Sequence, residues 1–221
     1  MQGKWAVNLD GDDYYTSTTF LSDAMNVIEQ YPNENIVAYC YKHLNLETIK
    51  KTIPYIKINE DCILVSGKDY FLNYYKIGCF SHPDTIFRRD IGVNIQLYTI
   101  PWQACDFHSL IRIFLLGNII LDRREISHWR IHGDNTTIKE VDDKQRQAML
   151  TFDAIEDFAK DYIPQNELAI WRKKMNKSSY IDYIQTHVFN KRNLKSVTLL
   201  LKNPHLKYWY FRCWAKIILN R

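Results

Sequence analysis

The chain has 221 residues, of which 46% are hydrophobic and 14% aromatic, so it can build a core and is not expected to be disordered. This length fits one domain, or one domain with an appendage. The five cysteines are widely spaced and form no C-x-x-C pair, which argues against a disulfide framework or a zinc cluster. No run is apolar enough to cross a bilayer and no secretory signal pattern is visible, so we expect a cytoplasmic protein.

Charge divides the chain into two unlike parts. Residues 1–170 carry 17 Lys and Arg against 24 Asp and Glu, whereas residues 171–221 carry 12 Lys and Arg against one acid, Asp182. A terminal segment this basic is typical of contact with an anionic partner, either a nucleic acid or an acidic membrane surface. The net charge of +4 conceals this division.

Hydrophobic periodicity and turn residues predict strands that alternate with helices. The expected strands span residues 5–9, 36–41, 55–58, 62–65, 85–88 and 119–121. The expected helices span residues 18–30, 68–75, 106–117 and 142–163, and a basic helical remainder has breaks at 176–179 and 203–204. This order predicts an α/β sheet in residues 1–140 and a helical, basic C-terminal extension in residues 141–221.

The segment "VNLDGDDYY" (7–15) places Asp10, Asp12 and Asp13 at the end of the first expected strand. Asp10 and Asp12 lie two residues apart, so both can face one side of an extended segment and hold one hard cation. Mg²⁺ or Mn²⁺ would offset their mutual repulsion. The alternative is an acidic surface turn, since Asp-Gly is a common turn dipeptide.

The acidic residues belong to the first of four segments that follow one another along the chain: "GKWAVNLDGDDYY" (3–15), "HPDTIFRRD" (82–90), "CDFHSLIRIFLLGNI" (105–119) and "WRIHGDNTT" (129–137). Together they resemble the D-x-D segment, the strand with paired arginines, the E-D-x-x-L-x-x-R helix and the closing Y-R-x-H segment of family 2 glycosyltransferases. The resemblance implies a partial GT-A fold, with a Rossmann-like mixed sheet, flanking helices and a helical C-terminal extension.

The resemblance implies an inverting transfer of a sugar from a nucleotide-diphosphate sugar to an acceptor hydroxyl. Asp106 matches the family's catalytic base, which takes the proton of that hydroxyl. Cys105 stands where the family usually has an acid, a departure from the pattern. From the residues alone, Asp106 could equally be a helix N-cap.

The resemblance also implies a set of binding residues. Asp10, Asp12 and His132 would hold the Mg²⁺ or Mn²⁺ ion, which would neutralise charge on the leaving diphosphate. The residues implied for substrate binding are Asp10, Asp13, Thr85, Arg88, Arg89 and Arg130. His82 could line the same pocket, and structural roles remain open for His82, Thr85 and His132. The implied acceptor is a saccharide or a lipid-linked saccharide, in surface polysaccharide assembly.

Family members carry further strands and helices before the D-x-D segment, including an aspartate that recognises the nucleotide. The sequence has nothing that matches them, so it reads as a truncated transferase whose Trp5–Leu9 strand lacks a neighbour. An inactive or partner-dependent remnant is therefore an alternative. A haloacid-dehalogenase-type phosphatase, with Asp10 as nucleophile and Asp12 as acid and base, is another, although Tyr14 replaces its Thr or Val.

The segment "HLKYWYFRCWAKIILNR" (205–221) mixes aromatic and basic residues. This composition fits a helix lying on the inner face of the cell membrane, but it equally fits a helical cap packed on the domain. A nucleic-acid partner is not expected, because no recognised binding motif accompanies these residues.

Overall fold

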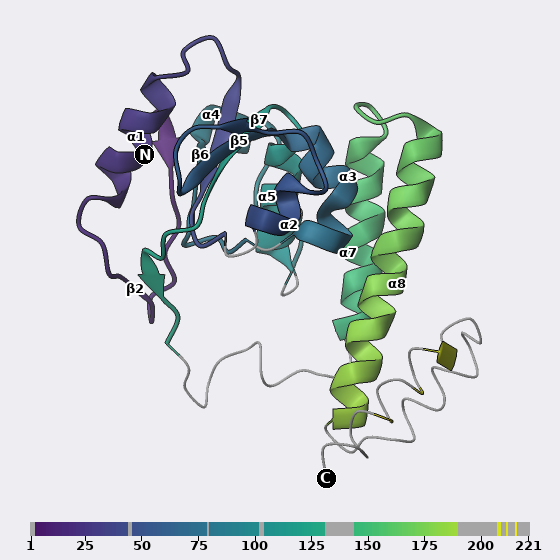
Figure 1. The fold of residues 1–221 in the computed structure, drawn as a ribbon. Coiled ribbons are helices and arrows are strands. Elements are labelled where there is room, and N and C mark those ends of the chain that lie inside the picture. The colour runs from purple at the N-terminus through teal and green to yellow at the C-terminus, as the bar shows by residue number, and fades with distance from the viewer. Residues whose placement is uncertain are drawn as a thin grey trace.

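The computed structural model describes residues 3–43, 46–78, 80–101, 104–130 and 144–189, together with residues 207, 208, 211 and 215. It is a mixed α/β structure whose central sheet has α1 on one side and a larger group of helices on the other (Figure 1). The longest helix, α8, runs along the outside of that group.

The central sheet has six strands and is mixed, as the sequence predicts. In spatial order these are β1 (Trp5–Ala6), β6 (Thr85–Arg88), β3 (Ile36–Cys40), β7 (Asn118–Asp122), β5 (Cys62–Ser66) and β4 (Ile56–Lys57). Only β3 and β7 are parallel neighbours, and the other four pairs are antiparallel. A second, two-stranded sheet joins β2 (Tyr14–Tyr15) to β8 (Ser127–His128).

Most of the helices lie where periodicity places them. Their bounds are α1 (Phe20–Glu29), α2 (Leu46–Lys50), α3 (Gly67–Ile77), α4 (Arg89–Asn94), α5 (Cys105–Phe114), α7 (Lys144–Ala159) and α8 (Gln165–Phe189). The predicted break at residues 176–179 is wrong, because α8 continues through it. Asn and Ser lower helix propensity only slightly, and packing outweighs them. The predicted break at residues 203–204 lies outside the described residues.

Alternation along the strands gives the sheet two apolar faces. In β3, Tyr39 points into the smaller core beside α1, while Ala38 and Cys40 point into the larger core on the opposite face. In β7, Ile120 faces α1, and Ile119 and Leu121 face the other helices. Because both faces are covered, all five residues of β3 and the three central residues of β7 (119–121) are apolar.

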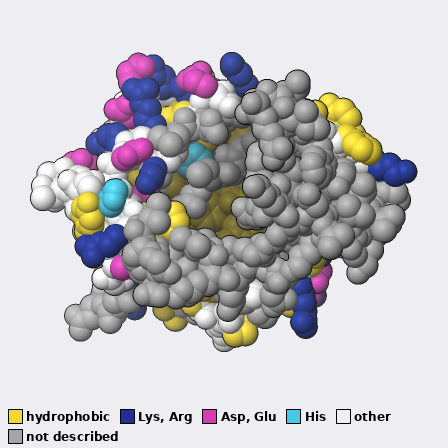
Figure 2. Space-filling view, turned by 90° about the horizontal axis from the view of Figure 1, so that it is seen from below, with side chains coloured by type: hydrophobic (Ala, Val, Ile, Leu, Met, Phe, Trp, Pro, Cys, Tyr) yellow, Lys and Arg dark blue, Asp and Glu magenta, His cyan; other side chains and the backbone are white. Residues whose placement is uncertain are grey.

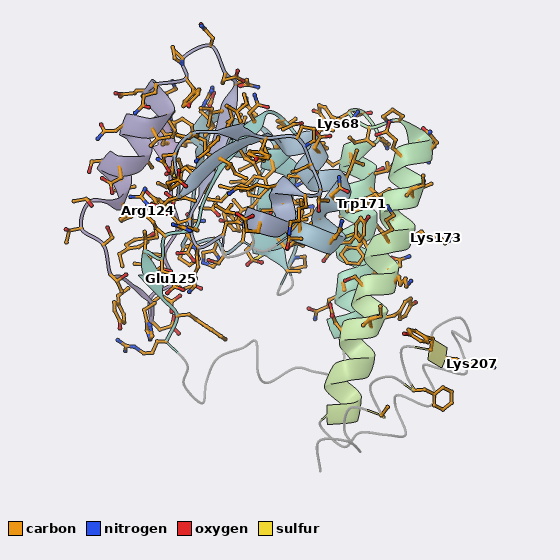
Figure 3. All side chains as sticks on the ribbon, viewed as in Figure 1. Lys68, Arg124, Glu125, Trp171, Lys173 and Lys207 are labelled. Atoms are coloured by element: carbon orange, nitrogen blue, oxygen red, sulfur yellow. The ribbon has the colours of Figure 1, made fainter. Side chains whose placement is uncertain are left out.

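The C-terminal helices share the larger core with the sheet. Trp171 of α8 is buried and stacks on Phe71 of α3, with ring centroids 4.7 Å apart. Phe152 of α7 packs edge-on against Trp171 and Phe107. In Figure 3, Trp171 lies on the side of α8 that faces the sheet, and Lys173 on the outer side. The predicted domain boundary near residue 140 lies outside the described residues.

The first strand is shorter than the sequence predicts. Only Trp5 and Ala6 of the expected residues 5–9 pair, with Arg88 and Phe87 of β6. Among the described residues β1 is an edge strand, since β6 is the only strand paired with it. The segment that follows it is therefore free to turn away from the sheet and form the acidic turn.

His43, directly after β3, should make the fold sensitive to acid. Its side chain is fully buried, its Nε2 lies 2.8 Å from the Tyr70 hydroxyl, and its Nδ1 has no hydrogen-bond partner among the described residues. Burial disfavours the charged imidazole and lowers the pKa of His43 to about 4. The unfolded chain binds a proton near pH 6.5, where the folded chain does not.

We therefore expect stability to be complete above pH 6.5 and to fall as pH decreases towards 4, by about 3 kcal/mol from this residue. Urea unfolding at pH 7, 5 and 4 measures the decrease, and His43→Gln should flatten it. An equal loss in both proteins would show that other groups govern acid unfolding.

Candidate functional site

The predicted acidic cluster forms a tight turn between β1 and β2. The Asp13 backbone N–H donates to the Asp10 carbonyl at 3.1 Å and closes the turn. The Asp13 carboxylate accepts a hydrogen bond from the backbone N–H of Arg130 at 2.9 Å. The backbone of Arg130, just after β8, therefore lies beside the acidic turn. Asp12 is partly buried and makes an interaction of its own.

His82 lies between two of the predicted site carboxylates. Its Nε2 is 3.1 Å from Asp10 Oδ1, and its Nδ1 is 3.6 Å from Asp106 Oδ2. The interaction with the Asp106 carboxylate is the main cause that raises the pKa of His82, and the charge of Asp10 adds to it. When protonated, His82 offsets the repulsion between these two acids, which lie 96 positions apart in the sequence.

Asp106 lies in the first turn of α5 and keeps its side chain 39% exposed. The N-cap of this helix is Ala104, and no side chain makes a capping bond there. One Asp106 oxygen accepts from the neighbouring Phe107 N–H at 2.7 Å, and the other faces His82. The N-cap alternative for Asp106 is therefore wrong, and its carboxylate stays accessible beside the acidic turn.

A buried aspartate fixes the loop that carries His82. Asp84 is 2% exposed and accepts hydrogen bonds from the hydroxyls of Ser81 and, at 2.6 Å, Ser127 of β8. The Tyr15 hydroxyl of β2 donates to the Pro83 carbonyl at 3.2 Å. These bonds tie the 81–84 loop to both strands of the small sheet. The sequence analysis did not identify Asp84 or Ser127. The only feature that could have revealed them is a polar side chain at a buried position.

The burial of Thr85 favours the structural role that the sequence left open for it. Its side chain is fully buried and its hydroxyl donates to the Ser81 carbonyl at 2.8 Å. Thr85 starts β6, where its side chain points inward into the packed layer. It therefore supports the His82 loop and cannot reach a ligand.

We call Asp10, His82 and Asp106 the His82 cluster. The contacts of Arg88 and Arg89 described here lie away from this cluster. Arg88 ends β6, as the expected strand 85–88 does, and Arg89 begins α4. Arg88 lies at the far end of the strand from Thr85, about 10 Å away at the usual rise per residue. Its guanidinium pairs with Asp90, and the Arg89 side chain donates to the Gly3 carbonyl at 2.5 Å.

A cavity of about 690 Å³ lies at that far end of the sheet, where Arg88, Lys4, Trp5 and Tyr31 are among its lining residues. It is separate from the His82 cluster, none of whose residues lines it. The two arginines therefore belong to this end of the molecule.

The described residues do not form a metal centre. Within them, no group of three or more His, Cys, Asp and Glu side chains is arranged to hold a metal ion. Asp10 is engaged by His82 and Asp13 by the Arg130 backbone. His132 lies outside the described residues, so the Mg²⁺ or Mn²⁺ site stays a prediction.

Exposed apolar side chains surround the carboxylates. Leu9 and Tyr14 flank the acidic turn, and Tyr14 and Trp129 are each 46% exposed. The Tyr14 ring lies 5.2 Å from the ring of its cross-strand neighbour His128. Tyr98 is held nearby by the side-chain amide of Asn8. Figure 2 shows acidic, basic and histidine side chains gathered with exposed hydrophobic ones on one part of this face.

In this arrangement, carboxylates that can accept hydrogen bonds from hydroxyl groups lie near exposed aromatic rings. The accessible Asp106 carboxylate can also accept a proton. No known protein-family model matches the chain, and no curated protein matches it either.

Proposed function

We propose that the chain is an inverting glycosyltransferase that moves a sugar from a nucleotide-diphosphate donor to an acceptor hydroxyl. The observation that carries the proposal is the meeting of Asp10 and Asp106 at one imidazole. They come from the two segments most similar to the family 2 transferases, and their proximity is what a shared reaction site requires. We further propose that the mixed sheet is part of a GT-A-like, Rossmann-related domain.

In this proposal Asp106 is the general base. Its carboxylate, with a side chain 39% exposed, accepts the proton of the acceptor hydroxyl while the acceptor oxygen bonds to the anomeric carbon. The bond from that carbon to the diphosphate oxygen breaks, and the nucleoside diphosphate leaves. The product is one glycoside with inverted configuration, one nucleoside diphosphate and a protonated Asp106. No step is assigned to a metal ion.

His82 has a positioning role in this proposal. It contacts both carboxylates, so it fixes the distance between the acidic turn and the base and offsets their charge. The exposed rings of Tyr14 and Trp129 suit the apolar face of a saccharide, while the carboxylates suit its hydroxyls. Arg130, whose backbone N–H donates to Asp13 in the acidic turn, is proposed to contact the donor's phosphates with its guanidinium.

The proposal is tested by incubating the full chain with a panel of nucleotide-diphosphate sugars and measuring release of the nucleoside diphosphate. The assay is run with and without Mn²⁺, so that a cation requirement becomes visible. Asp106→Asn should reduce the rate by at least about 100-fold, because the amide cannot accept the proton.

Asp90→Asn is the matched control. Asp90 is an exposed acid in the first turn of α4 and is paired with Arg88 away from the cluster. We expect its replacement to leave the rate within about twofold, since an exposed ion pair contributes little. Absence of turnover with every donor, or turnover equal in Asp106→Asn and the native chain, would refute sugar transfer by this site. The first outcome would favour a remnant without catalysis.

A further inference from the structure

Most of the basic segment of residues 205–221 lies outside the described residues, so the membrane contact considered for it stays a prediction. No described helix is long and apolar enough to cross a bilayer. A feature that the sequence did not indicate lies instead in the loop between α4 and α5, at Tyr98.

Tyr98 joins the acidic turn to α5. Its hydroxyl accepts a hydrogen bond from the side-chain amide of Asn8, two residues before Asp10. Its backbone N–H donates to the hydroxyl of Ser109, one helical turn after Asp106, at 2.8 Å. Tyr98 therefore forms a second bridge between these two segments, in addition to the bridge that the imidazole makes.

The backbone of this loop is held in an uncommon conformation. Gln96 has a φ of 53° and Tyr98 a φ of 58°, left-handed values that residues with a Cβ seldom adopt. The buried guanidinium of Arg112 donates to the carbonyl of Ile95 at 3.0 Å and to that of Gln96 at 3.2 Å. Such a conformation persists only where its surroundings impose it, and positions of this kind gather at ligand sites. Here α5 imposes it, and α5 also carries Asp106.

The Tyr98 side chain presents part of its ring and a hydroxyl proton. The residue is 39% exposed. Burial of the remainder is the main cause that raises the pKa of Tyr98 to about 12, and the charges of Asp106 and Asp10 add to it. The hydroxyl therefore keeps its proton at neutral pH. Its oxygen accepts from Asn8, and no residue in the described part of the chain accepts its proton, so the hydroxyl can still donate one hydrogen bond.

We propose that Tyr98 binds the acceptor saccharide of the sugar transfer, donating its hydroxyl proton to a sugar oxygen and placing its ring against the sugar's apolar face. A pyranose has an apolar C–H face and an edge of hydroxyl groups, so an aromatic ring with a neutral donor matches both. Tyr98 binds and orients the acceptor, and Asp106 takes its proton. The inference rests on the proposed function in one respect, because the bound sugar is an acceptor only if the site transfers sugar.

Saccharide binding is measured without turnover, by saturation-transfer NMR of the full chain with the methyl glycosides of glucose, galactose, mannose and N-acetylglucosamine. We expect at least one glycoside to bind, and Tyr98→Ala to weaken its binding about tenfold or more. The control is Tyr55→Ala, because Tyr55 is 42% exposed and precedes β4, at the opposite edge of the sheet from β1. That variant should bind as the native chain does. Absence of binding by all four glycosides, or equal binding by Tyr98→Ala and the native chain, would overturn the proposal.

Two further variants separate a contact with the sugar from a role in holding the loop. Tyr98→Phe and Asn8→Ala both remove the hydrogen bond between these two side chains. Only Tyr98→Phe also removes the hydroxyl proton, so we expect it to weaken glycoside binding about threefold or more beyond the effect of Asn8→Ala. Equal effects of the two variants would overturn the proposed donation and make the hydroxyl a positioning group.

Turnover distinguishes failure of this inference from failure of the proposed function. With a nucleotide-diphosphate sugar and the bound glycoside, Tyr98→Ala should raise the KM for the glycoside about tenfold and leave kcat within about threefold. Turnover with a KM that does not depend on Tyr98 would refute the inference and leave sugar transfer standing. Glycoside binding that depends on Tyr98, without turnover, would refute sugar transfer and leave the saccharide site standing. Circular dichroism of each variant verifies that weakened binding does not reflect unfolding.

Discussion

Replacing Gly67 with alanine is expected to destabilise the chain by about 3 kcal/mol or more, because the new methyl group would overlap backbone atoms. A Cβ at Gly67 would lie 1.7 Å from the Phe114 carbonyl oxygen and 2.4 Å from that of Gly117. The Gly67 N–H also donates to the Gly117 carbonyl at 2.9 Å. Relief of the overlap requires α3 and the end of α5 to move apart, which opens the larger core.

Urea-induced unfolding measures this loss, and Gly11→Ala is its control. Gly11 lies in the exposed acidic turn, and a Cβ there would have no atom of another residue within 4 Å. We expect Gly11→Ala to change the free energy of unfolding by less than about 1 kcal/mol. If the two variants were equally stable, the close approach of α3 to α5 would be incorrect.

Replacing Asp122 with alanine is expected to destabilise the fold by about 3–5 kcal/mol, because it leaves buried donors without an acceptor. Asp122 is fully buried at the end of β7. Its carboxylate accepts from the Tyr39 hydroxyl at 2.6 Å, from Cys62 Sγ at 3.1 Å and from Arg124 Nη2 at 2.7 Å. The Arg124 guanidinium in turn lies over the Tyr41 ring, and Figure 3 labels it on the α1 side of the sheet.

The neighbouring ion pair of Arg123 and Asp61 provides a matched control for Asp122→Ala. Arg123 Nε lies 2.5 Å from Asp61 Oδ1, but both side chains are exposed. Asp61→Ala should therefore cost no more than about 1 kcal/mol. Thermal unfolding of both variants at pH 7 compares a buried and an exposed carboxylate joined to adjacent arginines. Similar losses for the two would contradict the difference in burial.

The sequence predicts the long elements well because each has a strong local signal. The apolar runs of β3, β5 and β7 and the amphipathic pattern of α1 and α5 place those elements within a few residues of their observed bounds. The short elements had no such signal. α4 begins at Arg89, directly after an expected strand, and was not expected as a helix. The two-residue strands β2 and β8 exist only through pairing across the chain.

Part of the candidate site was also predictable, because some of its residues lie in recognisable sequence motifs. Acidic residues in an ordered series of motifs identified Asp10 and Asp106, which the structure brings to one side chain. The roles of His82 and Asp84 depend on distances between residues remote in the sequence, and no spacing rule encodes those distances. The two roles considered for Thr85 could not be separated from the sequence, because a buried threonine and a ligand-binding threonine look the same there.

The hydrogen bonds of Asp84 extend the region in which inactivating substitutions should be sought. Through Asp84, the hydroxyl of Ser127 holds the loop that presents His82, although Ser127 belongs to a different strand and lies 45 positions further along the sequence. A genetic screen for loss of function should accordingly recover changes at Ser81 and Ser127, positions that a search confined to the acids themselves would pass over.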